Sequence, residues 1–137
     1  QLQQDLPELR LMADASRLAQ VFDNLLTNAS KYAPHSTVTI SVEEEAQTVH
    51  VKLSDNGPGI APEHLQSLFK RFYRVPTPDK NVRGTGLGLF ICRQIVNAHN
   101  GEIWAESEVG QGTTFHIRLP YDQQEANQVL SLRENNV

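Results

Sequence analysis

Apolar side chains recur every three or four residues through the segment from Leu18 to Ala33. This spacing places them along one face of an α-helix. Asp14 or Ser16 can cap the start of that helix through a side-chain oxygen. Pro34 ends it, because proline cannot continue the helical hydrogen bonding. The apolar positions are Leu18, Val21, Phe22, Leu25, Leu26, Ala29 and Ala33.

Strict alternation of apolar and polar residues marks the predicted strands. A short strand is expected around Leu9–Ala13. Two more are expected around Val38–Val42 and Val49–Leu53, joined as a hairpin by the polar link EEEAQT. A last pair begins at Ile103 and ends at Leu119, where Pro120 stops it, with EVGQG as the turn between them.

Two further helices are predicted. Pro62 and Glu63 open a short one that contains Leu65, Leu68 and Phe69. The other follows a run of glycines and ends at Asn100–Gly101; its expected core stripe is Leu87, Ile91, Ile95 and Ala98. Helices mixed with strand hairpins predict an α+β fold, a two-layer α/β sandwich. Its mixed, mostly antiparallel sheet is covered by helices on one face.

The bulk composition narrows the function classes. A chain of 137 residues fits one domain. The net charge of −4 implies no general surface for nucleic acid. No apolar run approaches a membrane span, and no signal peptide is expected. Cys92 is the only cysteine, which excludes an internal disulfide and a four-cysteine zinc site, and it is predicted to be a small buried residue.

The glycines of the stretch VRGTGLGLF at 82–90 follow a basic segment, since five of the twelve Lys and Arg residues lie from Lys70 to Arg83. The glycines do not match a dinucleotide fingerprint, because Leu89 stands where the third glycine is needed, and no lysine completes a P-loop. They precede the N-terminus of a helix, where free N–H groups can bind an anion. A plain hinge before an ordinary helix is the alternative.

Asn24, Asn28 and Lys31 lie within about 60° of each other around the first helix, with Tyr32 next to them and the apolar stripe close by. Asparagine is a poor interior helix former, so the pair indicates either caps for neighbouring loops or a ligand site. An amide oxygen suits Mg²⁺, and Lys31 suits a phosphate.

Five stretches in this order resemble the ATP-binding catalytic domain of bacterial sensor histidine kinases, which belongs to a superfamily with gyrase, a heat-shock chaperone and the mismatch-repair ATPase. They are NLLTNASKY at 24–32, DNGPG at 55–59, FKRFYR at 69–74, GTGLGL at 84–89 and GQGTTF at 110–115. The resemblance covers about residues 8–120 and implies an α/β sandwich with an ATP lid loop.

The resemblance implies ATP and Mg²⁺ as cofactors. By this likeness Asn28 is the Mg²⁺ ligand, supported by Asn24, and Lys31 contacts phosphate. Tyr32 packs near the adenine, and Asp55 accepts a hydrogen bond from the adenine amino group. An acceptor-only carboxylate selects such a donor.

Other matched positions complete the expected site. Gly57 and Gly59 allow a tight turn beside the base, where a side chain would collide with it. Ile60 adds an apolar wall, and Thr113 reaches the Asp55 side, through water or directly. The hinge and the phosphate-binding helix start comprise Gly84, Thr85, Gly86, Leu87, Gly88 and Leu89, with Gly88 permitting close packing in the first turn.

The basic segment is expected to reach the phosphates. Either Arg71 or Arg74 contacts the terminal phosphate, and the sequence leaves open which one. Lys80 and Arg83, in the lid itself, are weaker candidates. Phe69 and Phe72 are expected to anchor the lid by packing on the body. The expected catalytic residues are Asn28, Lys31, Arg71 and Arg74.

Asn24 bears on which acceptor receives the phosphoryl group: water, a serine or a histidine. Relatives that hydrolyse ATP, or that phosphorylate serine, carry a glutamate base one turn before the Mg²⁺ asparagine. The amide of Asn24 cannot take a proton at neutral pH. Transfer to a histidine is therefore favoured, because a neutral imidazole already offers a lone pair.

None of the five histidines lies in a motif resembling H-E-x-x-x-P, so each is expected to be surface or structural. The acceptor is expected on a separate dimerisation and phosphoacceptor domain, with a response regulator downstream in two-component signal transduction. We expect residues 1–7 to be a linker remnant, 8–121 the catalytic domain and 122–137 a polar tail. The isolated domain is expected to be monomeric and cytoplasmic, within a soluble or membrane-anchored parent protein.

Three alternatives stay open. The first is a nucleotide-binding regulatory module that transfers no phosphate. The second is an ATP-driven clamp or chaperone ATPase, and the third is a kinase that phosphorylates serine and binds sigma-factor partners. Asn24 speaks against the last two, and the short lid also speaks against the clamp.

Overall fold

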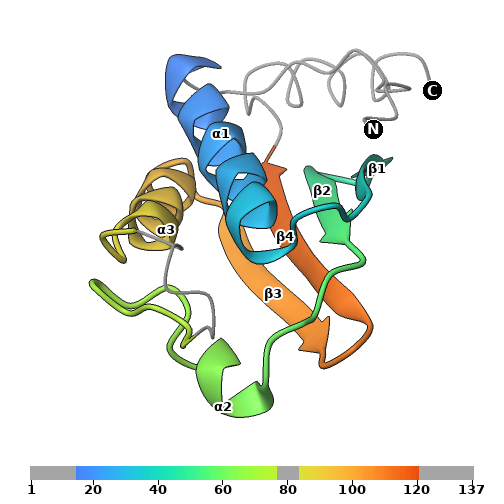
Figure 1. Cartoon of the computed structure of the whole chain (residues 1–137). Coiled ribbons are helices and arrows are strands. Elements are labelled where there is room, and N and C mark those ends of the chain that lie inside the picture. Colours follow the sequence, from blue (N-terminus) through green and yellow to red (C-terminus); the bar gives the residue numbers. More distant parts are fainter. Residues whose placement is uncertain (1–14, 77–83, 121–137) are drawn as a thin grey trace, which may run out of the picture.

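The computed structural model of the chain describes residues 15–76 and 84–120. Three helices and four strands occur in these residues (Figure 1). The predicted strand around residues 9–13, the cap at Asp14, the linker remnant at 1–7 and the tail at 122–137 lie outside them. The elements are α1 (Ala15–Tyr32), β1 (Val38–Glu44), β2 (Thr48–Asp55), α2 (Pro62–Leu65), α3 (Gly88–Ala98), β3 (Glu102–Glu108) and β4 (Gly112–Pro120).

The four strands form one sheet in the order β1-β2-β4-β3. The predicted hairpin of β1 and β2 is confirmed, with Val42 opposite Val51. The connection between the two strands is shorter than the expected EEEAQT, because β1 continues through Glu44. Glu43 belongs to the strand, and its carboxylate lies 3.0 Å from the Lys52 amine on β2. Every pairing among the described strands is antiparallel, so the parallel part of the expected mixed sheet is absent from them.

The hydrophobic core lies between the sheet and the helices α1 and α3, which cover one of its faces (Figure 1). This confirms the two-layer prediction. Leu25 of α1 and Val96 of α3 are both fully buried there. Each fully buried side chain of this size contributes about 1.5–3 kcal/mol. The sheet contributes Val49, Val51, Leu53, Phe115, Ile117 and Leu119.

The stripe predicted for α3 is partly wrong. Ala98 is exposed, whereas Cys92, Ile95 and Val96 are buried, because these three face α1 and the sheet together. The predicted end of the helix is confirmed. Asn100 adopts a left-handed φ of 59°, and the Gly101 N–H donates to the Val96 carbonyl at 2.9 Å. These are features of a Schellman cap, which terminates the helix.

Helix α2 is shorter than predicted. It ends at Leu65, and the residues after it form turns. Leu68 is nevertheless buried, and the Phe69 ring meets the Phe115 ring edge-on, with 6.3 Å between centroids. Tertiary packing holds these two side chains where the helical period was expected to place them.

Two histidines pair on the sheet face opposite the helices. His50 and His116 are each 7% exposed, and a hydrogen bond of 2.9 Å joins His50 Nε2 to His116 Nδ1. Burial lowers the pKa of His116, against the opposing effect of Glu106. These contacts agree with the prediction that such histidines are structural. No helix in the described ranges is long and apolar enough to cross a bilayer.

The prediction that Cys92 is buried is confirmed, because this residue is 0% exposed. Burial raises the pKa of its thiol to about 11.

This pKa predicts slow alkylation of Cys92. Alkylation needs the thiolate, and a pKa of about 11 leaves about one thiol in a thousand as thiolate at pH 8. We expect native Cys92 to react with iodoacetamide about a hundredfold more slowly than a free cysteine. Mass spectrometry of the alkylated protein measures this rate. The rate should rise with pH and become normal in denaturant; a normal rate in the folded protein would contradict the burial.

Candidate functional site

A pocket of about 400 Å³ opens beside α1, at the end of the sheet where β2 stops. Its volume falls in the range of small-molecule sites. Most of the side chains predicted for a ligand site line it. They are Asn24, Asn28, Lys31, Tyr32, Asp55, Gly59, Ile60, Arg74, Gly84, Thr85, Gly86, Gly88, Leu89 and Thr113.

One wall of the pocket is α1. Asn24, Asn28 and Lys31 stand one helical turn apart on this wall, with Tyr32 beside them. The Asn24 amide Nδ2 donates to the Gly88 carbonyl at 3.4 Å. Asn24 therefore ties α1 to the first residue of α3, whereas the capping alternative expected contacts with neighbouring loops. Asn28 adds a second amide to the same wall.

Asp55, the last residue of β2, lines the end of the pocket that adjoins the sheet. Its Oδ1 accepts a hydrogen bond from the Gly57 N–H at 2.9 Å, which fixes the plane of the carboxylate. Thr113 of β4 is the cross-strand partner of Asp55 and lines the pocket beside it. Two acceptor-capable groups thus stand together at this end.

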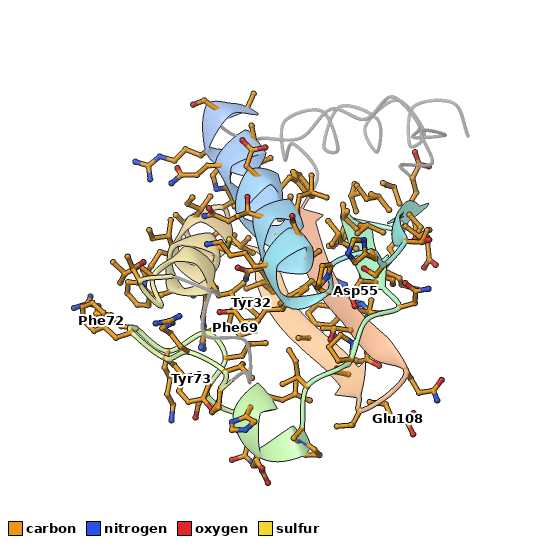
Figure 2. All side chains as sticks on the ribbon, in the orientation of Figure 1. Tyr32, Asp55, Phe69, Phe72, Tyr73 and Glu108 are labelled. Atoms are coloured by element: carbon orange, nitrogen blue, oxygen red, sulfur yellow. The ribbon has the colours of Figure 1, made fainter. Side chains whose placement is uncertain are left out.

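The reason expected for the glycines of DNGPG is wrong in its detail. A Cβ on Gly59, whose φ is +78°, would lie 2.2 Å from the Glu108 carbonyl oxygen. The close neighbour of Gly59 is therefore the β3–β4 hairpin, at whose edge Figure 2 labels Glu108. Gly57 does not line the pocket; a Cβ there would lie 2.3 Å from the Cβ of Ala33. Both glycines set the backbone of the loop by close packing within the protein.

The structure separates the two arginines of FKRFYR. Arg74 lines the pocket. Arg71 lies outside the lining, with its guanidinium 4.7 Å from the centre of the Phe90 ring. Arg83 and Lys80 lie outside the described residues.

The two phenylalanines of this stretch differ as well. Phe69 packs against the core, but Phe72 is 66% exposed. Figure 2 places Phe72 at the periphery, apart from Phe69. The prediction that the Phe72 side chain anchors the lid by packing is therefore wrong. Its backbone makes the attachment instead, because the Phe72 N–H donates to the Gly86 carbonyl at 2.9 Å.

Several lining residues were not predicted. Tyr73 is the clearest, and its hydroxyl hydrogen-bonds to His64 Nδ1 on α2. Tyr73 stands inside the quoted FKRFYR motif, so that motif was the available signal. The other residues that were missed are Thr27, Ala29, Ala33, Pro58, Leu68, Val75, Pro76 and Phe115.

The N-terminus of α3 faces the pocket through Gly88 and Leu89. Leu87, its N-cap residue, supplies no capping side chain and does not line the pocket. The Leu87 N–H donates to Thr85 Oγ1 at 3.2 Å. The first turn holds no acidic residue. This end of the helix suits an anion, because it combines unpaired N–H groups with the positive end of the helix dipole.

Of the three glycines at the start of α3 (Gly84, Gly86 and Gly88), Gly86 has the strictest requirement. Its φ is +73°, and a Cβ there would lie 2.5 Å from the Phe72 carbonyl carbon. The other two have room: the nearest atom is the Lys31 Nζ at 3.9 Å for Gly84 and the Asn24 Cγ at 4.0 Å for Gly88. The expected close packing at Gly88 is therefore wrong.

We expect Gly86→Ala to destabilise the protein by about 2 kcal/mol or more, since the left-handed φ and the collision with Phe72 add. Thermal unfolding measures the loss. Gly84→Ala is the matched control and should leave the midpoint within about a degree or two of wild type. Equal midpoints for both variants would contradict the close approach of Gly86 and Phe72.

The donor set of the pocket fits magnesium bound together with phosphate. Among residues 15–76 and 84–120, no group of three or more His, Cys, Asp or Glu side chains is placed to hold a metal ion. The pocket offers amide oxygen at Asn28, next to Lys31 and the N-terminus of α3. Mg²⁺ commonly takes only one or two protein oxygens and completes its shell with phosphate and water.

Comparison with known proteins agrees with this geometry. Residues 13–123 match the family described as histidine kinase-, DNA gyrase B- and HSP90-like ATPase. The sensor protein SrrB of Staphylococcus aureus (strain NCTC 8325 / PS 47) is 47% identical over 109 residues, which are 78% of this chain and 19% of SrrB. The chain thus spans about a fifth of the length of this curated relative.

Solved structures are similar in fold. The catalytic domain of the histidine kinase ThkA superposes with a TM-score of 0.72 at 34% identity, covering 85% of this chain and 76% of that domain. ThkA in complex with the response regulator TrrA gives 0.70 at 30% identity, covering 88% and 33%. Full-length ShkA in complex with AMPPNP gives 0.71 at 30% identity, covering 84% and 24%.

Proposed function

The chain belongs to the family of histidine kinase-, DNA gyrase B- and HSP90-like ATPases, and we propose that it is the ATP-binding catalytic domain of a sensor histidine kinase. It binds Mg-ATP and donates the γ-phosphoryl group to a histidine on a separate domain. The observation that carries this proposal is the pocket itself. It holds a carboxylate at one end, and amides, an amine and a helix N-terminus elsewhere along its wall.

The nucleotide lies with its base at Asp55 and its phosphates toward α3. Asp55 Oδ1 is engaged by the Gly57 N–H at 2.9 Å, so the second carboxylate oxygen accepts from the adenine amino group. Tyr32 and Ile60 flank the base with apolar surface. Gly57 acts on the base only through this hydrogen bond to Asp55.

The phosphates meet the N–H groups at the start of α3, with Lys31 and Arg74 as the charged partners. The carbonyl oxygen of Asn28 holds Mg²⁺ there, while Asn24 holds α3 against α1. When bound, Mg²⁺ neutralises charge on the phosphate oxygens. Arg74 takes the role left open between two arginines, because it lines the pocket and Arg71 does not.

The proposed transfer is an in-line displacement. The imidazole nitrogen of the acceptor histidine forms a bond to the γ-phosphorus, and the bond from that phosphorus to the bridging oxygen breaks. ADP leaves with the electron pair, and the imidazole later releases its proton to water. Lys31 and Arg74 stabilise the charge that develops on the oxygens, which is the main contribution that a protein makes to phosphoryl transfer.

The same pocket argues for transfer instead of hydrolysis. A water nucleophile needs a base, and residue 24 is an amide whose Nδ2 donates to the Gly88 carbonyl at 3.4 Å. No proton acceptor is supplied from that position. A neutral imidazole needs none.

The partners follow from the relatives. SrrB is a sensor protein, and ThkA forms a complex with a response regulator. We therefore expect a dimerisation and phosphoacceptor domain as the direct partner and a response regulator downstream. We place the catalytic domain, assigned to residues 8–121, in the cytoplasm, where ATP is available.

The test mixes this chain with Mg-ATP and a helical hairpin fragment that carries the acceptor histidine and accepts phosphate from a known kinase. Acid-labile phosphate on that histidine is the expected product. Nucleotide binding without transfer to several competent hairpins would favour the regulatory module, and rapid release of free phosphate would favour an ATPase.

A further inference from the structure

Three polar residues form one row across the sheet at the base end of the pocket. Asp55 of β2 is the cross-strand partner of Thr113 of β4, and Thr113 is the partner of Ser107 of β3. Cross-strand partners project from the same face of a sheet. Asp55 and Thr113 line the pocket, and Ser107 stands behind Thr113, outside the lining. Ser107 therefore contacts the pocket only through its neighbours.

The Ser107 hydroxyl has three hydrogen-bonding neighbours. The Ile60 N–H approaches its Oγ at 2.7 Å, the Gly112 carbonyl oxygen at 2.8 Å and the Thr113 Oγ1 at 2.8 Å. A hydroxyl has one hydrogen and two lone pairs, so these three contacts use all of its capacity.

The chemistry of the neighbours determines the direction of each bond. An N–H can only donate, so Ile60 occupies one lone pair of Ser107. A carbonyl can only accept, so the single hydrogen of Ser107 points to Gly112. One lone pair is left for Thr113, and the Thr113 hydroxyl must therefore donate its own hydrogen to Ser107.

Thr113 consequently presents only lone pairs to the pocket. Its neighbour Asp55 is a carboxylate, which also only accepts. The base end of the pocket is thus an array of two acceptors from adjacent strands. Adenine places a donor, its amino group, at purine position 6, whereas guanine and hypoxanthine place a carbonyl oxygen there.

Building on the proposed ATP binding, we propose that Ser107 is a positioning residue for base selection: it holds the Thr113 hydroxyl as an acceptor and so favours adenine over 6-oxopurines. A bridging water keeps the same polarity. Such a water gives its two hydrogens to Asp55 and Thr113, and its oxygen then faces the base as an acceptor. A 6-oxo group meets lone pairs in both arrangements.

Removal of the Ser107 hydroxyl releases the Thr113 hydrogen. The Thr113 hydroxyl can then rotate and donate into the pocket, which makes a 6-oxo group acceptable. The Ile60 N–H loses its partner too, so the affinity for every nucleotide is expected to fall. The informative quantity is therefore the ratio of the ATP and ITP dissociation constants, because ITP carries a carbonyl where ATP carries the amino group.

The experiment measures the binding of Mg-ATP and Mg-ITP to this chain by calorimetry. Ser107→Ala should lower the preference for ATP by about fivefold to tenfold. In a Thr113→Val background the same substitution should leave the ratio unchanged, since no hydroxyl remains to rotate. If Ser107→Ala fails to fold, Ser107→Cys replaces it, because a thiol is a much weaker hydrogen-bonding partner.

The chain offers a matched control in Ser54→Ala. Ser54 Oγ lies 2.8 Å from Thr114 Oγ1, which is the same kind of hydroxyl–hydroxyl contact across two strands. Ser54 directly precedes Asp55 in the chain, but its side chain lies on the other face of the sheet. This variant should keep the wild-type ratio. A folded Ser107→Ala protein with the wild-type ratio, or an equal change in Ser54→Ala, would overturn the role of Ser107.

The same measurements distinguish a failure of the proposed kinase function from a failure of the proposed role of Ser107. Wild-type chain that prefers ATP but does not phosphorylate the hairpin would remove the kinase assignment and leave the role of Ser107 intact. Wild-type chain that binds neither nucleotide, although folded by circular dichroism, would remove both proposals.

Discussion

Asn28→Ala is expected to abolish the Mg²⁺ dependence of ATP binding and to lower phosphoryl transfer by about a hundredfold or more. Asn28 lines the pocket on the same wall as Lys31, where its amide oxygen is the proposed metal ligand. Calorimetry with ATP in magnesium and in EDTA measures the first effect. Transfer to the hairpin fragment measures the second.

The fold should survive this substitution, because alanine is a better helix former than asparagine by about 0.6 kcal/mol. Gln20→Ala is the matched control. It removes a carboxamide from an exposed position of α1 outside the pocket and should behave as wild type. If Asn28→Ala keeps the wild-type difference between magnesium and EDTA, Asn28 is not the metal ligand.

Asp55→Asn is expected to weaken ATP binding by about 10-fold to 100-fold, because a hydrogen bond to a charged group contributes about 1.5–3 kcal/mol. The amide oxygen of the new residue can keep the bond from Gly57, which is 2.9 Å long in the wild type. Its NH₂ group then faces the base and opposes the adenine amino group. The same change should improve the relative binding of ITP.

Calorimetry with the two nucleotides checks both parts of this prediction. Asp23→Asn makes the same chemical change at an exposed position of α1 outside the pocket, so it controls for the loss of one charge. Unchanged ATP affinity in Asp55→Asn, with the control also unchanged, would remove Asp55 from base recognition.

Most of the fold could be predicted because it depends on local periodicity. The repeat from Leu18 onward gave α1, and alternation gave the β1–β2 hairpin, both of which are confirmed. The errors occur where tertiary contacts override the local pattern. Leu68 and Phe69 are held by the core after α2 has ended, and α3 buries Val96 and leaves Ala98 exposed because it faces two neighbours at once.

The candidate site was predictable to the same extent. Asn24, Asn28 and Lys31 share a wall because positions three or four apart on a helix always do. Arg71 and Arg74 could not be separated in this way, since turns follow α2 and no helical period orients them. Phe72 was misplaced for a related reason: its left-handed φ of 67° turns the side chain outward.

The sequence by itself determined the elements, the amide and lysine wall of α1 and the acidic end of β2, because each depends on spacing within one segment. Tertiary structure alone decided which arginine reaches the pocket, why Gly59 and Gly86 must lack side chains, and which way the Thr113 hydroxyl donates. The two glycine requirements and the direction of the Thr113 hydroxyl each depend on an atom of another segment: the Glu108 carbonyl, the Phe72 backbone or the Ser107 hydroxyl of the neighbouring strand. Hydrogen bonds and close contacts of this kind form only after the strands and loops have met, so no local pattern records them.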